Sequence, residues 1–142
     1  GSACSAQLIL SSDPVAYPYV RDLDILVAMS QDAYRLFAGE VKPGGLILVD
    51  EDLVTPETRP ERRILAVPAT RIAESLGKRI VANMVMVGFF EASTNLLEVE
   101  SVREAIRTSV PTGTEDANVA AFDAGFQHAR GLAAVGGGED RP

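Results

Sequence analysis

Short apolar runs bounded by turn-forming residues mark the first half of the chain. Apolar runs of about four to eight residues between Gly, Pro, Ser and Asp clusters are typical of β-strands. They predict strands over Cys4–Leu10, Leu23–Ala28, Leu46–Val49 and Ile64–Val67. The apolar residues of Leu23–Ala28 follow one another instead of alternating with polar ones. We therefore expect this strand to be buried on both faces of a sheet.

Apolar residues at helical spacing predict helices between these strands. Ser30 suits the N-cap of the first helix, where its hydroxyl would accept a backbone hydrogen bond. The buried face of this helix would consist of residues three and four apart, Tyr34, Phe37 and Val41, before Pro43–Gly45 ends it. Thr70 can cap a second, short helix that runs through Leu76 and closes at Gly77.

The second half of the chain predicts helices alone. Ile80–Ala92 is apolar nearly all round, which is expected of a helix enclosed by other elements. Gly88 in its middle suggests close approach of a neighbouring backbone. Ser101 and Glu104 form a capping-box pattern that opens a helix to about Val110. The last helix begins near Thr114 and would bury apolar residues at helical spacing: Val119, Phe122, Phe126 and Ala129.

Strands that alternate with helices indicate an α/β fold. We expect a three-layer Rossmann-like domain over residues 1–133, with a mainly parallel sheet and a helical C-terminal half, followed by a disordered glycine-rich tail over residues 134–142. A length of 142 residues fits one domain.

Charge and composition exclude several classes of partner and site. A formal net charge of -7 argues against nucleic acid and against an anionic membrane surface. No apolar run approaches the roughly 20 residues that span a bilayer, so we expect a cytoplasmic protein. Cys4 is the single cysteine and His128 the single histidine, which excludes an internal disulfide, a four-cysteine iron–sulfur site and a cysteine-rich zinc site.

The sequence also lacks the usual cofactor motifs. It has no thiamine diphosphate stretch beginning Gly-Asp-Gly and ending in Asn, no phosphate-binding Gly-x-x-x-x-Gly-Lys-Ser/Thr loop, and no Gly-x-Gly-x-x-Gly after a strand. We therefore predict no catalytic residue and no metal site, and no cofactor held by this chain alone.

A few residues remain as candidates, each with an ordinary alternative. Ser30 and Gln31 would lie at the carboxyl end of a parallel strand, where α/β sheets bind ligands, although a plain helix cap explains them equally. Asn83, a buried amide in the apolar helix, would bond a neighbouring backbone or a cofactor at a subunit interface. The Arg59–Arg63 loop is expected to be a solvated loop rather than a phosphate site. Cys4 is expected to be buried, and His128 to lie on a helix surface.

Several segments, in their order and spacing, resemble one protein family. They are Gly1–Gln7, Asp24–Gln31, Val41–Val49 (Val-Lys-Pro-Gly-Gly-Leu-Ile-Leu-Val), Val67–Thr70, Ala82–Gly88, Pro111–Glu115 and Ala120–Phe126. The family is the gamma subunit of 2-oxoacid:ferredoxin oxidoreductases. Tyr17–Val20 and Ala28–Gln31 are most similar to its 2-oxoglutarate branch. The glycine-rich segment with which family members begin has no counterpart here, so we expect a fragment or a trimmed chain.

The resemblance implies a noncatalytic subunit of a complex. Such complexes convert a 2-oxoacid and coenzyme A to acyl-CoA and carbon dioxide and reduce ferredoxin. Thiamine diphosphate, magnesium and iron–sulfur clusters would belong to the alpha, beta and iron–sulfur subunits, which are the expected partners, with ferredoxin an indirect one. The residues expected to face the cofactors are Ser2, Cys4, Ser5, Ser30, Gln31 and Asn83.

Two other hypotheses stay open from the residues alone. One is a stand-alone Rossmann-like module that binds a small molecule or nucleotide, which rests on fold analogy. The other is a homo-oligomeric enzyme with Cys4 as its nucleophile, for which no base beside the thiol is evident.

Overall fold

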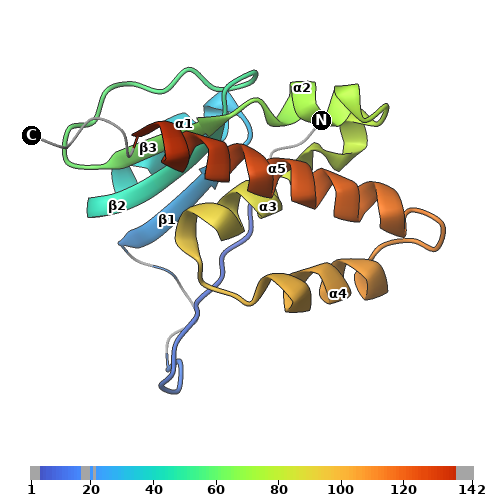
Figure 1. The fold of residues 1–142 in the computed structure, drawn as a ribbon. Coiled ribbons are helices and arrows are strands. Elements are labelled where there is room, and N and C mark those ends of the chain that lie inside the picture. The colour runs from blue at the N-terminus through green and yellow to red at the C-terminus, as the bar shows by residue number, and fades with distance from the viewer. Residues whose placement is uncertain (1–3, 17–19, 21, 137–142) are drawn as a thin grey trace, which may run out of the picture. The chain divides into compact units, whose positions relative to one another are not determined.

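The computed structural model describes residues 4–16, 20 and 22–136. The elements in chain order are β1 (Leu23–Ala28), α1 (Gln31–Phe37), η1 (Ala38–Glu40), β2 (Val41–Asp50), β3 (Arg63–Val67), α2 (Ala69–Ser75), η2 (Arg79–Val81), α3 (Ala82–Thr94), α4 (Val99–Ser109) and α5 (Glu115–Gly136) (Figure 1). The chain divides into two compact units. The first contains β1, α1, most of β2 and the start of β3, and the second contains residues 50–52 and the chain from Ala66 onward. The α/β class, the parallel sheet and the helical C-terminal half are confirmed.

The sheet has three parallel strands in the order β1-β2-β3. Central β2 is buried continuously from Gly45 to Asp50, as expected of a strand covered on both faces. The same prediction was wrong for β1, where Leu26 and Ala28 are buried but Val27 is 40% exposed. β1 is an edge strand of the sheet, paired with β2 alone. In the described part of the chain, the face of β1 that carries Leu26 and Ala28 is covered, and the face that carries Val27 is not.

The start of β2 differs from the sequence prediction. The first helix ends at Phe37, and Val41 is the first residue of β2 rather than the last buried residue of the helix. Pro43–Gly45 lies in an irregularity of the β1–β2 pairing instead of ending a helix. A Cβ at Gly45 would lie 2.5 Å from Val41 Cγ1 and 2.8 Å from the Lys42 carbonyl oxygen, so glycine is needed there.

The strand predicted over Cys4–Leu10 was wrong. These residues have no regular secondary structure and are exposed, with Leu8 at 78%. An apolar run becomes a strand only when a sheet edge supplies hydrogen bonds. No backbone hydrogen bond to a strand is found for this run among the described residues.

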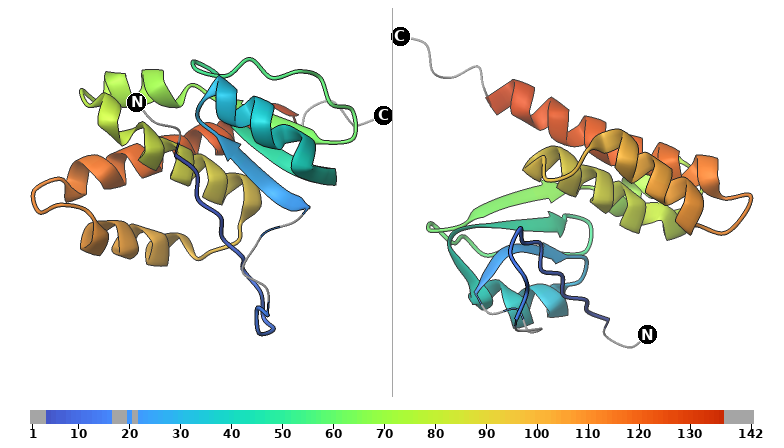
Figure 2. Two further views of the ribbon diagram at one scale, coloured as in Figure 1. Left: turned by 180° about the vertical axis from the view of Figure 1, so that it is seen from behind. Right: turned by 90° about the horizontal axis from the view of Figure 1, so that it is seen from below.

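In the second unit, α3 packs along α5, and α4 packs on α5 (Figures 1 and 2). The close approach predicted at Gly88 is confirmed, because a Cβ there would lie 1.9 Å from the Phe122 carbonyl oxygen. The contact is reciprocal, since a Cβ at Gly125 would lie 1.9 Å from the Val85 carbonyl oxygen. The two helix backbones therefore touch at a pair of glycines.

The predicted faces and ends of α5 hold in part. The helix begins at Glu115, directly after Thr114, and buries Phe122 and Ala129 as predicted, while the other two expected core residues, Val119 and Phe126, are half-buried. It extends to Gly136, past the expected start of the tail. Residues 137–142 lie outside the described part of the chain.

Two predicted helix caps were wrong. Helix α4 begins at Val99, and its N-cap is Glu98, whose carboxylate accepts from the backbone N–H of Ser101 at 2.7 Å and of Glu100 at 3.1 Å. These hydrogen bonds, first from Ser101 and then from Glu100, lower the pKa of Glu98 below its ordinary value of 4.5. Ser101 is thus inside the first turn. Thr70 is likewise inside α2, which starts at Ala69 and closes near Gly77 at a φ of +81°.

Candidate functional site

The end of β2 carries a buried carboxylate that fixes α2. Asp50 is fully buried. Its Oδ2 accepts from the Thr70 backbone N–H at 3.1 Å and from the Thr70 hydroxyl at 2.7 Å, and its Oδ1 accepts from the Asp52 N–H at 3.1 Å. Asp50 therefore does for α2 what a side-chain N-cap does, from a position distant in sequence. Its oxygens already have donors, as a buried charge requires.

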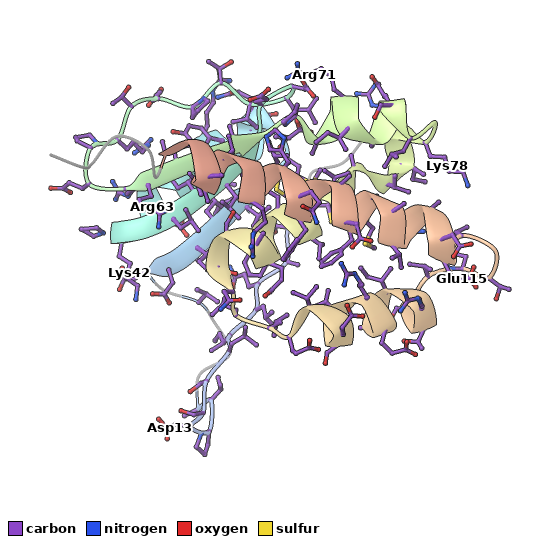
Figure 3. All side chains as sticks on the ribbon, in the orientation of Figure 1. Asp13, Lys42, Arg63, Arg71, Lys78 and Glu115 are labelled. Atoms are coloured by element: carbon purple, nitrogen blue, oxygen red, sulfur yellow. The ribbon has the colours of Figure 1, made fainter. Side chains whose placement is uncertain are left out.

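Arg71 closes the same strand end from outside. Its guanidinium donates to Asp52 Oδ1 at 2.5 Å and to Glu51, and its backbone N–H donates to Asp52 Oδ2 at 3.0 Å (Figure 3). The hydrogen bond to Asp52 is the main reason that the pKa of Arg71 is raised. An arginine already shared by two carboxylates is poorly placed to bind a phosphate.

In the first unit, Ser30 and Gln31 follow the carboxyl end of β1, a parallel strand, as predicted. The Ser30 hydroxyl accepts from the Ala33 N–H at 3.2 Å, so its role as the N-cap of α1 is confirmed. The Gln31 amide pairs with the Thr55 backbone, accepting from its N–H at 2.8 Å and donating to its carbonyl at 3.4 Å. Both side chains have structural partners, so helix capping and loop attachment account for them.

Tyr34 continues this attachment of the 53–59 segment to α1. Its hydroxyl, on a ring that is 1% exposed, accepts from the Glu57 N–H at 3.0 Å and from Arg59 Nε at 3.3 Å, and donates to the Glu57 carbonyl at 3.2 Å. Arg62 Nε donates to the Val41 carbonyl at 2.5 Å. The Arg59–Arg63 segment is thus neither a phosphate cradle nor freely solvated, because two of its arginines hold the segment to the protein.

The other predicted site residues in the described part of the chain are Cys4, Ser5 and Asn83. Cys4 and Ser5 are exposed in the irregular segment, so the expected burial of the Cys4 thiol was wrong. Ser2 lies outside the described residues. Asn83 belongs to the second unit.

Asn83 is also exposed, which overturns its prediction as a buried amide. Its side-chain oxygen accepts from the Met84 N–H at 2.9 Å, at the start of α3. His128 is half-buried on α5, with its ring centroid 6.1 Å from that of Phe89, rather than a surface residue.

Sequence reasoning missed the residues that do most to organise these strand ends. The signal that could have found Asp50 is its place directly after the apolar run Leu46–Val49, where an acidic side chain is buried only when hydrogen-bond donors surround it. Among the described residues, no group of three or more His, Cys, Asp or Glu side chains could hold a metal ion. Within that same part of the chain, no helix is long and apolar enough to cross a membrane.

Comparison with known proteins decides the family. Residues 1–128 match the model of the pyruvate ferredoxin/flavodoxin oxidoreductase family. The chain belongs to this family. It is 42% identical to 2-oxoglutarate synthase subunit KorC of Methanocaldococcus jannaschii over 93% of this chain and 72% of KorC. The resemblance inferred from the ordered motifs is thereby confirmed.

Other family members show the fold and its different settings. The gamma subunit of a keto/oxoacid ferredoxin oxidoreductase from Geobacter sulfurreducens PCA has a TM-score of 0.72 and 33% identity, covering 76% of this chain and 64% of that subunit. Ketoisovalerate oxidoreductase subunit VorA of Methanothermobacter marburgensis is 33% identical over 92% of this chain, but the match covers only 28% of VorA. The same domain thus occurs in the family as part of a much longer polypeptide.

Proposed function

We propose that this chain is the noncatalytic gamma subunit of a 2-oxoglutarate:ferredoxin oxidoreductase complex. The observation that carries the proposal is 42% identity to a 2-oxoglutarate synthase subunit over 93% of the chain. The likeness to a crystallised gamma subunit of an oxoacid ferredoxin oxidoreductase supports the same assignment.

The reaction sets requirements that this sequence does not meet alone. Oxidation of 2-oxoglutarate with coenzyme A yields succinyl-CoA, carbon dioxide, one proton and two electrons, and ferredoxin takes up the electrons. The decarboxylation needs an electron sink such as thiamine diphosphate. Electron transfer through iron–sulfur clusters needs about four cysteine ligands for each cluster, whereas this sequence has Cys4 alone.

The sequence of this chain has neither the binding motif for thiamine diphosphate and magnesium nor enough cysteines for an iron–sulfur cluster. The proposal therefore places those groups in the alpha, beta and iron–sulfur subunits. The role left for this chain is to pack against those subunits and complete the region around coenzyme A. Of the residues expected to face that region, Cys4, Ser5 and Asn83 are exposed and available for such contacts. Ser30 and Gln31 would take part through their loop, because their side chains already hold α1 and Thr55. The complex is proposed to work in the cytoplasm.

Co-purification tests this proposal. The chain is tagged at its C-terminus in its native host, purified under mild conditions, and assayed for bound subunits, thiamine diphosphate and iron. The proposal predicts stoichiometric partners that carry thiamine and iron–sulfur absorbance, and neither cofactor on the chain after dissociation. A chain that is recovered alone from cells that contain the active complex would contradict it.

A further inference from the structure

Two side chains of α1 hold the 53–59 segment by its backbone. The Gln31 amide exchanges two hydrogen bonds with the peptide groups of Thr55, and the Tyr34 hydroxyl exchanges two with those of Glu57. Gln31 and Tyr34 are three positions apart and therefore lie on one side of α1. Thr55 and Glu57 are two positions apart, which is the period of an extended chain. Alternate residues of the segment are thus paired as a neighbouring antiparallel strand would pair them.

The sequence of the segment favours this extended shape. Pro56 and Pro60 disfavour helical backbone at the residues before them, which are Thr55 and Arg59. In the part of the chain that the structure describes, no strand pairs with the segment, because the sheet consists of β1, β2 and β3. The position of the segment therefore depends on the side chains of α1 rather than on the sheet.

Tyr34 is the firmer of the two attachments. It is 1% exposed, and its hydroxyl has a further partner, the Nε of Arg59 at 3.3 Å. A phenol can donate one hydrogen bond and accept two, so the segment uses the whole capacity of this hydroxyl. The hydrogen bonds of Gln31 are open to solvent, and one of them is 3.4 Å long. The Tyr34 hydroxyl therefore does most to fix the position of the segment.

The attached segment lies beside residues that are expected to face a ligand. Gln31 follows Ser30 at the carboxyl end of β1, and open α/β sheets bind ligands outside the carboxyl ends of their parallel strands. The proposed function assigns Ser30 and Gln31 to the region around coenzyme A. Because Tyr34 is buried, its hydroxyl does not touch a ligand. It can influence one only through the position of the segment.

We propose that Tyr34 is a positioning residue for coenzyme A, whose hydroxyl holds the 53–59 segment where the segment and Gln31 contact this substrate in the complex. The inference rests on the proposed function, and it adds a residue and a physical role. Without the hydroxyl, the peptide groups of exposed Glu57 pair with water, and the segment samples other positions. Coenzyme A then binds less tightly, because only a fraction of the molecules hold the segment in the binding position.

The test is steady-state kinetics of the complete complex that carries Tyr34→Phe, a variant that keeps the buried ring and removes only the hydroxyl. We expect the KM for coenzyme A to rise about fivefold, because a hydrogen bond changes an equilibrium constant by about two- to tenfold. The KM for 2-oxoglutarate and kcat should stay within about twofold of the wild type. Thr94→Val is the matched control. It removes a hydroxyl bonded to the Phe90 carbonyl at 2.8 Å in the other unit, and it should leave both KM values unchanged.

Amide exchange in the wild-type complex gives a second measurement that needs no variant. Saturating coenzyme A should slow exchange in the 53–59 segment at least about threefold, because the bound substrate holds the segment in one position. Addition of 2-oxoglutarate alone should leave this exchange unchanged. The measurement decides the matter even if Tyr34→Phe fails to fold, which circular dichroism would show.

Each outcome decides one question. If the wild-type complex does not oxidise 2-oxoglutarate with coenzyme A, the proposed function fails, and this inference fails with it. If that complex is active but Tyr34→Phe has the wild-type KM for coenzyme A, the positioning role is overturned while the function stands. A rise in both KM values together with a loss of kcat indicates a general structural defect and overturns the role as well. Unchanged exchange in the segment on addition of coenzyme A does the same.

Discussion

The crossing of α3 and α5 at Gly88 makes the sharpest prediction about this fold. In Gly88→Ala the new methyl would lie 1.9 Å from the Phe122 carbonyl oxygen, 2.8 Å from its carbonyl carbon and 2.9 Å from the Phe126 nitrogen. All three obstacles are backbone atoms, which cannot turn aside as a side chain can. A relaxed contact between carbon and a carbonyl oxygen is about 3.3 Å, so the helices would separate by about 1.4 Å.

The magnitude follows from two opposed effects. Alanine is favoured over glycine inside a helix by about 1 kcal/mol. Overpacking of a well-packed contact costs about 1–3 kcal/mol, and a rigid backbone obstacle places this case at the upper end. The net expectation is a loss of about 2 kcal/mol in the free energy of unfolding. For a chain of this size that corresponds to a decrease in Tm of about 6–8 °C.

The assay is thermal and urea unfolding followed by circular dichroism at 222 nm. Gly125→Ala should behave like Gly88→Ala, since its Cβ would lie 1.9 Å from the Val85 carbonyl oxygen. Gly131→Ala is the matched control, because it lies in the same helix as Gly125 with nothing within 4 Å of its Cβ, and it should be neutral or stabilising by up to about 1 kcal/mol. A Gly88→Ala protein as stable as Gly131→Ala would refute the close crossing.

Further predictions concern the strand ends and the α4 cap. Asp50→Ala should lower the free energy of unfolding by about 3 kcal/mol in urea titrations, because it removes three hydrogen bonds to a buried carboxylate. Arg71→Ala breaks exposed ion pairs and should lower the same free energy by less than about 1 kcal/mol. Equal losses would show that the cluster is not organised around Asp50. Because folding lowers the pKa of Glu98, its cap should stabilise α4 fully above pH 4.5 and be lost as the pH falls through the lower folded value. NMR titration should show this transition, and Glu98→Gln should abolish it. Gln31→Ala should speed amide exchange at Thr55 at least about fivefold without unfolding the sheet, and unchanged exchange would exclude the attachment.

The sequence was most informative where one local pattern dominates. Apolar runs and turn residues located β1 and β3 closely, and Ser30 was recognised as a cap because its partner is three residues away. Gly88 was interpreted correctly because a glycine in an apolar helix has few explanations other than close packing.

The sequence failed where a tertiary partner replaces a local one. Thr70 looks like a helix cap, but Asp50, brought near by β2, takes that role. At the start of α4 both Glu98 and Ser101 are suitable N-cap residues. In the structure the carboxylate of Glu98 is the cap, and it accepts the backbone N–H of Ser101. Ile80–Ala92 is apolar on all sides, so its pattern does not indicate which face of the helix is buried. For this reason Asn83 was wrongly predicted to be buried. The predicted site residues come from both units, and their grouping into one site stays a prediction.

Ferredoxin reduction tests the central claim most directly. Purified complex, the same complex rebuilt without this chain, and the chain alone are each given 2-oxoglutarate and coenzyme A, and reduced ferredoxin is followed by absorbance. We predict turnover by the complex, a severe loss without this chain that its addition restores, and none by the chain alone. Turnover by the isolated chain, or full activity of the complex that lacks it, would contradict the account.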